Sequence, residues 1–313
     1  MKPQALSSSA RGHLLALGAT VIWSLVYLFA RTLADRFSPV ELTFWRWTVA
    51  FAALFPFVYR RVWVCREAIR RHIVRLAVFS LFGMVGFSAL VFLSGKTSSV
   101  TNMSLLAATA PIFIALVSRF ILKERLDSRQ VLGLGIAVCG VVVLVTRGDP
   151  SLLLNLGLSG GDLWMLAGAL CFGTYTILVR YRPASIPQVE FLTVLMGLGA
   201  LWMLPFVAYG WCFGAGFTVP TPGEAFSLLC LGVLTSVIAF LWWNEAIARI
   251  GSVRCGAMYY SLPFFSFLLA MVTLGERLSL PQAVGGILII GGILFSSLPA
   301  LMQAHRAERH GRR

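Results

Sequence analysis

The chain is poor in charge. Only 12% of its 313 residues are Asp, Glu, Lys or Arg, whereas 58% are hydrophobic, and a soluble domain averages about 25% charged residues. Because so few polar side chains are available to cover a surface in water, we exclude a water-soluble globular protein. The basic residues, which give a net charge of +14, occur in short runs between apolar stretches. This distribution argues against a nucleic-acid partner and indicates a protein embedded in a lipid bilayer.

Patterns typical of catalysis and metal binding are also missing. The sequence has no GxxxxGK[ST] phosphate loop, no HExxH and no CxxC, which excludes ATP as the energy source of this chain alone. The four histidines lack the spacing of metal ligands, and the six cysteines form no obvious pair. We therefore expect no metal, no cofactor and no enzyme activity.

Apolar runs recur along the whole chain. A helix crosses the hydrocarbon core with about 20 apolar residues. Ten runs of about this length lie near 14–31, 40–59, 75–95, 98–121, 130–147, 161–180, 190–210, 226–244, 253–274 and 282–301. Short turns between them predict a helical bundle with almost no domain outside the membrane.

The basic residues predict how the bundle is oriented. With the N-terminus in the cytoplasm, nineteen of the 26 Lys and Arg residues fall on the cytoplasmic side and five on the outer side. Cytoplasmic loops carry the excess of Lys and Arg in membrane proteins. Both termini are therefore expected to be cytoplasmic, and the absence of a large soluble loop or organelle signal favours a bacterial inner membrane.

Two parts of the chain repeat each other. The segment PIFIALVSRFILKERLDSRQVLGLGIAVCG begins at Pro111, PFFSFLLAMVTLGERLSLPQAVGGILIIGG begins at Pro263, and ten of the thirty paired positions are identical. Because each half holds five spans, an odd number, the second half enters the membrane from the opposite side. The predicted fold is an all-α integral membrane protein with ten transmembrane helices in two inverted five-helix repeats.

These features together resemble the EamA family of the drug/metabolite transporter superfamily. The resemblance rests on the pattern P…LxER…Q…G…G at the end of each half, on SPVELTFWRW, and on GDLWMLAGALCFGTYTILVR. It covers the repeats 12–147 and 161–299, which a basic cytoplasmic tail follows at 300–313. The resemblance implies a secondary transporter of small organic metabolites, with amino acids as candidates, that works as an exporter by alternating access. A non-transporting scaffold or assembly subunit is the alternative, and an integral membrane enzyme is a weaker one.

Polar and aromatic side chains within the apolar runs mark a candidate pathway, because the hydrocarbon core makes them costly unless they face a cavity or another helix. We expect an aromatic-walled substrate site lined by Trp23, Tyr27, Arg46, Asn102, Tyr175, Asn244, Tyr259, Tyr260 and Ser261. Packing is the alternative for the last two tyrosines. Trp242 and Trp243 are expected to be anchors at the membrane interface.

Arg46 has no counterpart in the second half, because pairing Pro39 with Pro187 places Val194 at its position. A guanidinium suits the carboxylate or phosphate of a solute. The alternative is a structural role, in a pair with Glu41 or a helix carbonyl end, or in stacking on the neighbouring indoles. Since no acidic residue stands at the centre of a span, uniport or solute exchange is favoured over proton coupling through Glu41 or Glu245.

The repeats also carry structural signals. The pairs Glu124–Arg125 and Glu276–Arg277 fall at tight turns, where we expect a helix cap and a salt bridge rather than solute binding. Pro111 and Pro263 lie near mid-span at equivalent positions, and each is expected to be a hinge or a static kink. Glycines seven residues apart in both halves predict close helix packing or, alternatively, a homodimer interface.

Overall fold

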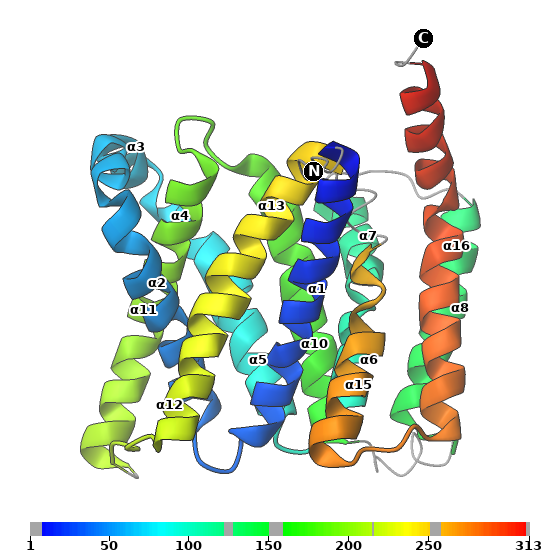
Figure 1. Ribbon diagram of the computed structural model, residues 1–313, viewed down its shortest axis with the longest axis horizontal. Helices are drawn as coiled ribbons and strands as arrows, with labels where there is room; N and C mark the ends of the chain where they lie inside the picture. Colours follow the sequence, from blue (N-terminus) through cyan, green and yellow to red (C-terminus); the bar gives the residue numbers. More distant parts are fainter. Residues whose placement is uncertain (1–7, 122–127, 150–158, 215, 251–257, 311–313) are drawn as a thin grey trace, which may run out of the picture.

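The computed structural model describes residues 8–121, 128–149, 159–214, 216–250 and 258–310. These residues form helices and no strand, and the long helices lie side by side in one bundle (Figure 1). Six helices are long and apolar enough to cross a bilayer: Ser9–Thr32, Pro39–Val64, Ile73–Ser94, Gly160–Leu178, Gln188–Phe213 and Pro222–Ile247. Shorter apolar helices accompany them. The chain is thus an all-helical protein with several helices able to span a membrane.

The first part of the chain begins with α1 (Ser8–Thr32) and α2 (Pro39–Val64), followed by the short α3 (Arg66–Arg71). One continuous helix then comprises α4 (Ile73–Ser80), the π-helical η1 (Leu81–Gly86) and α5 (Phe87–Ser94). Three further helices complete this part: α6 (Val100–Ala107), α7 (Ala110–Ile121) and α8 (Ser128–Val145).

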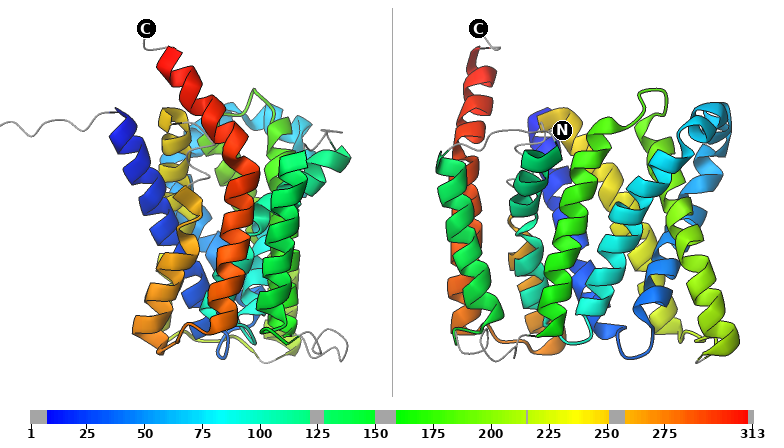
Figure 2. Two further views of the ribbon diagram at one scale, coloured as in Figure 1. Left: turned by 90° about the vertical axis from the view of Figure 1, so that its right-hand side faces the viewer. Right: turned by 180° about the vertical axis from the view of Figure 1, so that it is seen from behind.

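The second part begins with α10 (Gly160–Leu178), the 3-10 turn η2 (Val179–Tyr181) and α11 (Gln188–Phe213). Another continuous helix comprises α12 (Pro222–Leu229), the π-helical η3 (Cys230–Ile238) and α13 (Ala239–Ile250). The chain closes with α15 (Leu262–Leu274) and α16 (Leu280–His310). Helix α1 begins at the end of the bundle where α16 finishes (Figures 1 and 2). The residues expected to form a tail after position 300 continue α16 as far as His310.

Local sequence explains where two of the long helices begin. At α2, the Ser38 hydroxyl accepts from the Glu41 amide at 3.1 Å, and the Glu41 carboxylate accepts from the Ser38 amide at 2.9 Å. Thr221 and Glu224 form the same capping box at α12. In both places a proline occupies the first helical turn, where its missing N–H costs no helical hydrogen bond.

Pro111 and Pro263 lie in the first turns of helices. Helix α6 ends at Ala107 and α7 begins at Ala110, so Pro111 follows a break in the helix. Pro263 occupies the first turn of α15. The expectation of prolines inside continuous helices is therefore wrong, because the first turn accepts the ring without losing a backbone bond. The hinge interpretation stays a prediction.

The glycines at the ends of the two halves pack against each other. A Cβ on Gly140 would lie 2.7 Å from the carbonyl oxygen of Gly285, and a Cβ on Gly285 would lie 2.9 Å from that of Gly140. Only glycine permits the backbones of α8 and α16 to approach so closely. The predicted close packing is confirmed within the chain, so this stripe does not require a second copy.

Candidate functional site

An aromatic cavity lies among α1, α2, α10 and α13. It has two adjoining parts, of about 350 and about 40 Å³. Five aromatic side chains line both parts: Trp23, Phe172, Tyr175, Phe240 and Tyr259. We call the two parts together the aromatic cavity. Its larger part falls within the size range of small-molecule pockets.

The larger part extends toward one end of the bundle. Val179, Gln188 and Ile247 line it, and they lie where α10 ends, where α11 begins and near the end of α13. This is the end where α1 begins, at the top of Figure 1. The smaller part lies deeper and forms the floor of the cavity.

Arg46 of α2 lines this floor and is only 2% exposed. Its Nε donates to the Ser236 hydroxyl at 2.9 Å, and its Nη1 donates to the Ser88 hydroxyl at 3.5 Å. The guanidinium carbon lies 4.9 Å from the centroid of the Trp47 indole. Among the residues that the structure describes, no carboxylate forms an ion pair with Arg46. A buried cation is thus held by neutral partners, at an unfavourable desolvation cost.

The two serines stand at matching places in the halves. Ser88 follows η1, and Ser236 lies in η3. They are 148 residues apart, the spacing that also pairs Pro39 with Pro187. The Ser236 hydroxyl donates to the Leu231 carbonyl at 3.1 Å, which leaves its lone pairs for Arg46. Each half therefore supplies one hydroxyl to the single arginine.

The two π-helical segments also position two indoles. Trp47 Nε1 donates to the Met84 carbonyl in η1 at 2.8 Å, and Trp23 Nε1 donates to the Thr235 carbonyl in η3 at 2.9 Å. In η3, the Ala239 amide bonds to a carbonyl five residues earlier. The Thr235 carbonyl, which an α-helix would pair with that amide, accepts the Trp23 indole instead. Single π-helical turns occur often at functional sites.

Gly83 of η1 makes room for an aromatic wall of the cavity. A Cβ at this position would lie 2.3 Å from the ring of Tyr175, a distance that no real contact of this kind shows. The glycine therefore permits the Tyr175 ring to lie directly against the backbone of η1, where it is 8% exposed.

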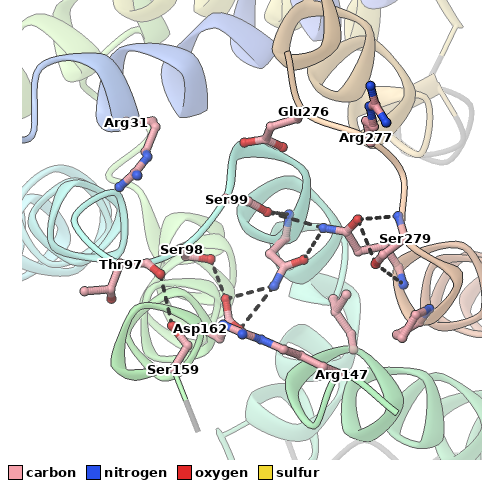
Figure 3. A pocket seen from close by; sticks show the side chains of 14 residues that line it. Arg31, Thr97, Ser98, Ser99, Arg147, Ser159, Asp162, Glu276, Arg277 and Ser279 are labelled. Carbon is pink, nitrogen blue, oxygen red and sulfur yellow. Dashed lines mark hydrogen bonds between the residues drawn. The ribbon is translucent and has the colours of Figure 1, made fainter. Parts of the chain in front are cut away.

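A polar cavity of about 600 Å³ lies at the opposite end of the bundle (Figure 3). The buried Asp162 carboxylate of α10 accepts from the Ser98 hydroxyl and from the Asn102 side-chain amide, the latter at 3.2 Å. The Asn102 carbonyl in turn accepts from Gln282 Nε2 at 2.9 Å. Figure 3 also shows the Arg147 side chain reaching toward Asp162. Hydrogen bonds thus join α6, α10 and α16 across the two halves of the chain.

Comparison with known proteins places the chain in a family. The model of the EamA-like transporter family matches residues 10–146 and 159–298, which together make up most of the chain. The chain belongs to the EamA-like transporter family. It is a multi-pass membrane transporter, and its helices with a membrane-spanning length agree with this.

Several curated relatives carry transporter names. The chain is 26% identical over 285 residues to an uncharacterised transporter, YyaM, of Bacillus subtilis, covering 91% of this chain and 93% of that one. It is 27% identical over 300 residues to a probable terminal-alkyne amino-acid exporter of Streptantibioticus cattleyicolor, covering 95% and 97%. A solved crystal structure shares the fold, with a TM-score of 0.59 at 24% identity, and covers 95% of this chain and 98% of that chain.

Most of the predicted site residues of this EamA-like transporter border the aromatic cavity. They are Trp23, Tyr27, Arg46, Tyr175, Asn244, Tyr259 and Tyr260. Trp243, expected as an interfacial anchor, also lines the cavity, with its ring 5.1 Å from that of Trp23. Sequence reasoning missed Phe172, Phe240, Ser88 and Ser236. The spacing of 148 residues was a signal that could have found the two serines.

Two predicted residues lie elsewhere. Asn102 belongs to the polar cavity at the opposite end, because it stands only three residues after Ser99, the cap that begins α6. Ser261 does not line the aromatic cavity, and its hydroxyl donates to the Met258 carbonyl at 2.6 Å.

Glu41 does not pair with Arg46, because it serves the α2 capping box and also accepts from the Trp211 indole at 3.1 Å. Of the structural alternatives for Arg46, the contact with a neighbouring indole is present.

Glu276 caps a helix, although not at its own turn. Its carboxylate accepts from the amides of Val100 and Thr101 at 2.9 and 3.2 Å, so it caps α6, which lies in the other half of the chain. Arg277 lines the polar cavity, and among the described residues it forms no salt bridge with Glu276. The matching pair Glu124–Arg125 lies outside the described residues.

Proposed function

We propose that this transporter exports small organic solutes that carry a carboxylate on an apolar body, in the size class of amino acids. The observation that carries the proposal is Arg46, a buried cation at the floor of an aromatic cavity whose described partners are two neutral hydroxyls and an indole. A guanidinium fork with spare donors binds a carboxylate in a bidentate manner. The aromatic walls suit the apolar part of the solute.

The proposed topology is ten spans in two inverted repeats, with both termini in the cytoplasm of a bacterial inner membrane. Three observations support it. The basic residues favour this orientation, helix α1 begins at the end where α16 finishes, and the segment with η1 resembles the segment with η3 in helix type and in its serine. In such folds, the substrate site lies near the midplane between the repeats.

Transport would proceed by alternating access. The aromatic cavity extends toward the end proposed as cytoplasmic, whereas Asp162, Gln282 and Glu276 tie α10, α16 and the loop before α16 to α6 at the opposite end. This arrangement corresponds to a state that receives solute from the cytoplasm. An outward-facing state would require the hydrogen bonds of the polar cavity to open. We propose uniport or solute exchange as the mode of coupling.

The experiment is solute counterflow in proteoliposomes that contain only this chain. Radiolabelled apolar and aromatic amino acids are compared with amines of the same size that lack the carboxylate. Accumulation of the amino acids but not of the amines would support the proposal. Equal transport of both sets would refute the carboxylate requirement. No flux of any solute in the panel would favour the alternative, a membrane scaffold or assembly subunit.

A further inference from the structure

A groove of about 580 Å³ lies outside the transport pathway, between the last turns of α2, the short helix α3 and α11. Apolar side chains such as Phe55, Val62 and Ile69 form its walls, and Val194 contributes from α11. In Figure 1 this is the upper left of the bundle, where α3 lies at the end of α2. The groove shares no lining residue with the aromatic cavity.

Three arginines line the same groove: Arg60, Arg66 and Arg70. Two of them are stacked on aromatic rings, with the Arg60 guanidinium 5.7 Å from the Tyr59 ring and that of Arg66 5.1 Å from the Trp63 ring. Stacking holds a guanidinium in place while most of its N–H donors remain available. These donors are therefore presented together at one end of an apolar groove.

The order of polarity along the groove matches a phospholipid. Phe55 lies eleven residues before Arg66, which corresponds to about 16 Å at 1.5 Å per helical residue. The apolar wall thus extends deep along α2, and the cationic groups lie near the helix end, where phospholipid headgroups are found. A free phosphate ion would satisfy the arginines but would leave the apolar wall uncovered.

Local charge supports an anionic ligand. The segment from position 59 to 75 holds six arginines and one acidic residue, Glu67. Large apolar side chains are exposed beside the groove, among them Phe57 at 84% and Trp63 at 68%. Exposed apolar surface next to clustered arginine is the composition of a lipid-binding surface at the edge of a membrane.

We propose that this groove binds one anionic phospholipid, with its phosphate on Arg66 and Arg70, its headgroup next to Arg60 and an acyl chain along the Phe55 side of α2. The inference goes beyond the transport function and does not depend on which solute is carried. Phosphate oxygens accept two parallel hydrogen bonds from a guanidinium, which gives the site its preference for a phosphodiester with a net charge.

The test is lipid binding to the delipidated full-length chain in detergent, measured by native mass spectrometry. Phosphatidylglycerol and phosphatidylcholine with the same acyl chains are titrated in parallel, and inorganic phosphate is the competitor. The variant R66Q/R70Q removes two arginines from the groove. The matched control R61Q/R71Q removes the same charge from the same exposed segment, at positions that do not line the groove.

We expect the chain to bind phosphatidylglycerol in preference to phosphatidylcholine. R66Q/R70Q should weaken phosphatidylglycerol binding by about tenfold or more, whereas R61Q/R71Q should change it by less than about twofold. Equal losses in both variants would show that overall surface charge, and not this groove, attracts the lipid. Equal binding of the two lipids by the unmodified chain, or displacement of the lipid by millimolar phosphate, would also overturn the proposal.

Discussion

Replacing Arg46 by glutamine separates a solute-binding role from a structural one. If the guanidinium holds a solute carboxylate, the substitution removes a hydrogen bond to a charged group, which contributes about 1.5–3 kcal/mol. Because 1.4 kcal/mol corresponds to a factor of ten, the apparent affinity for a carboxylate solute should fall by about 10- to 100-fold. Arg46→Lys keeps the charge but lacks the planar fork, so its affinity should lie between those of the unmodified protein and the Gln variant.

The stability of the same variant should change little. The buried arginine costs about 2.5–3.5 kcal/mol when placed at the centre of a bilayer, and the neutral amide avoids most of this cost. Against this gain stand the lost contact with the Trp47 ring, about 0.5–2 kcal/mol, and the weaker bond to Ser88. The opposing contributions nearly cancel, so we expect the free energy of unfolding to change by about 1 kcal/mol or less.

The assay combines counterflow at graded solute concentrations with thermal unfolding of the purified variants. Arg31→Gln is the control, because Arg31 donates to the carbonyls of Gly95 and Lys96 and does not line the aromatic cavity. It should leave the affinity unchanged. A folded Arg46→Gln protein with unaltered affinity would remove Arg46 from the binding site. A variant that loses stability and affinity together would point to the structural role instead.

Three further outcomes are expected. Gly83→Ala should lower transport and cost about 1–3 kcal/mol of unfolding free energy, because its methyl group would overlap the Tyr175 ring. Gly135→Ala, where nothing lies within 4 Å of the added Cβ, is the matched control, and equal effects would contradict this explanation. In a cysteine-free background, a cysteine at Ser128 should react with impermeant reagents only from the cytoplasm and one at Ser279 only from outside; labelling of both from one face would exclude the inverted repeat. Pro263→Ala should slow turnover in counterflow with little change in solute affinity, and unchanged turnover would leave only a static break in the helix.

The sequence allowed the cavity walls to be predicted where a side chain is costly in lipid. Trp23, Tyr27, Tyr175 and Tyr259 are conspicuous in apolar runs, and they do converge in space. A helical position defines depth along the helix much better than it defines which neighbour the side chain meets. Asn102 was therefore assigned to the wrong cavity, since its closeness to the start of α6 places it near the end of the bundle.

The serines and the acidic cluster were missed for a different reason. A serine in an apolar helix usually bonds to its own backbone, so Ser88 and Ser236 give no strong signal by themselves. Asp162 lies in the first turn of α10, where a carboxylate is ordinary, and only the tertiary structure shows that it is buried against Ser98. Partners from distant parts of the chain, such as Glu276 on α6, cannot be found from local spacing alone.

The two π-helical segments make the chemistry of the cavity depend on the number of residues in a helix. A π-helical turn holds one more residue than an α-helical turn, so deleting one residue from η1 would restore ordinary α-helical winding. Every later side chain of that helix would then turn by about 100° relative to the part before it. Ser88 would leave Arg46, and a neighbour would take its place without any substitution. A one-residue change in length at positions 81–86 or 230–238 is therefore a route by which such a transporter could acquire a different solute preference while keeping its helix packing outside these turns.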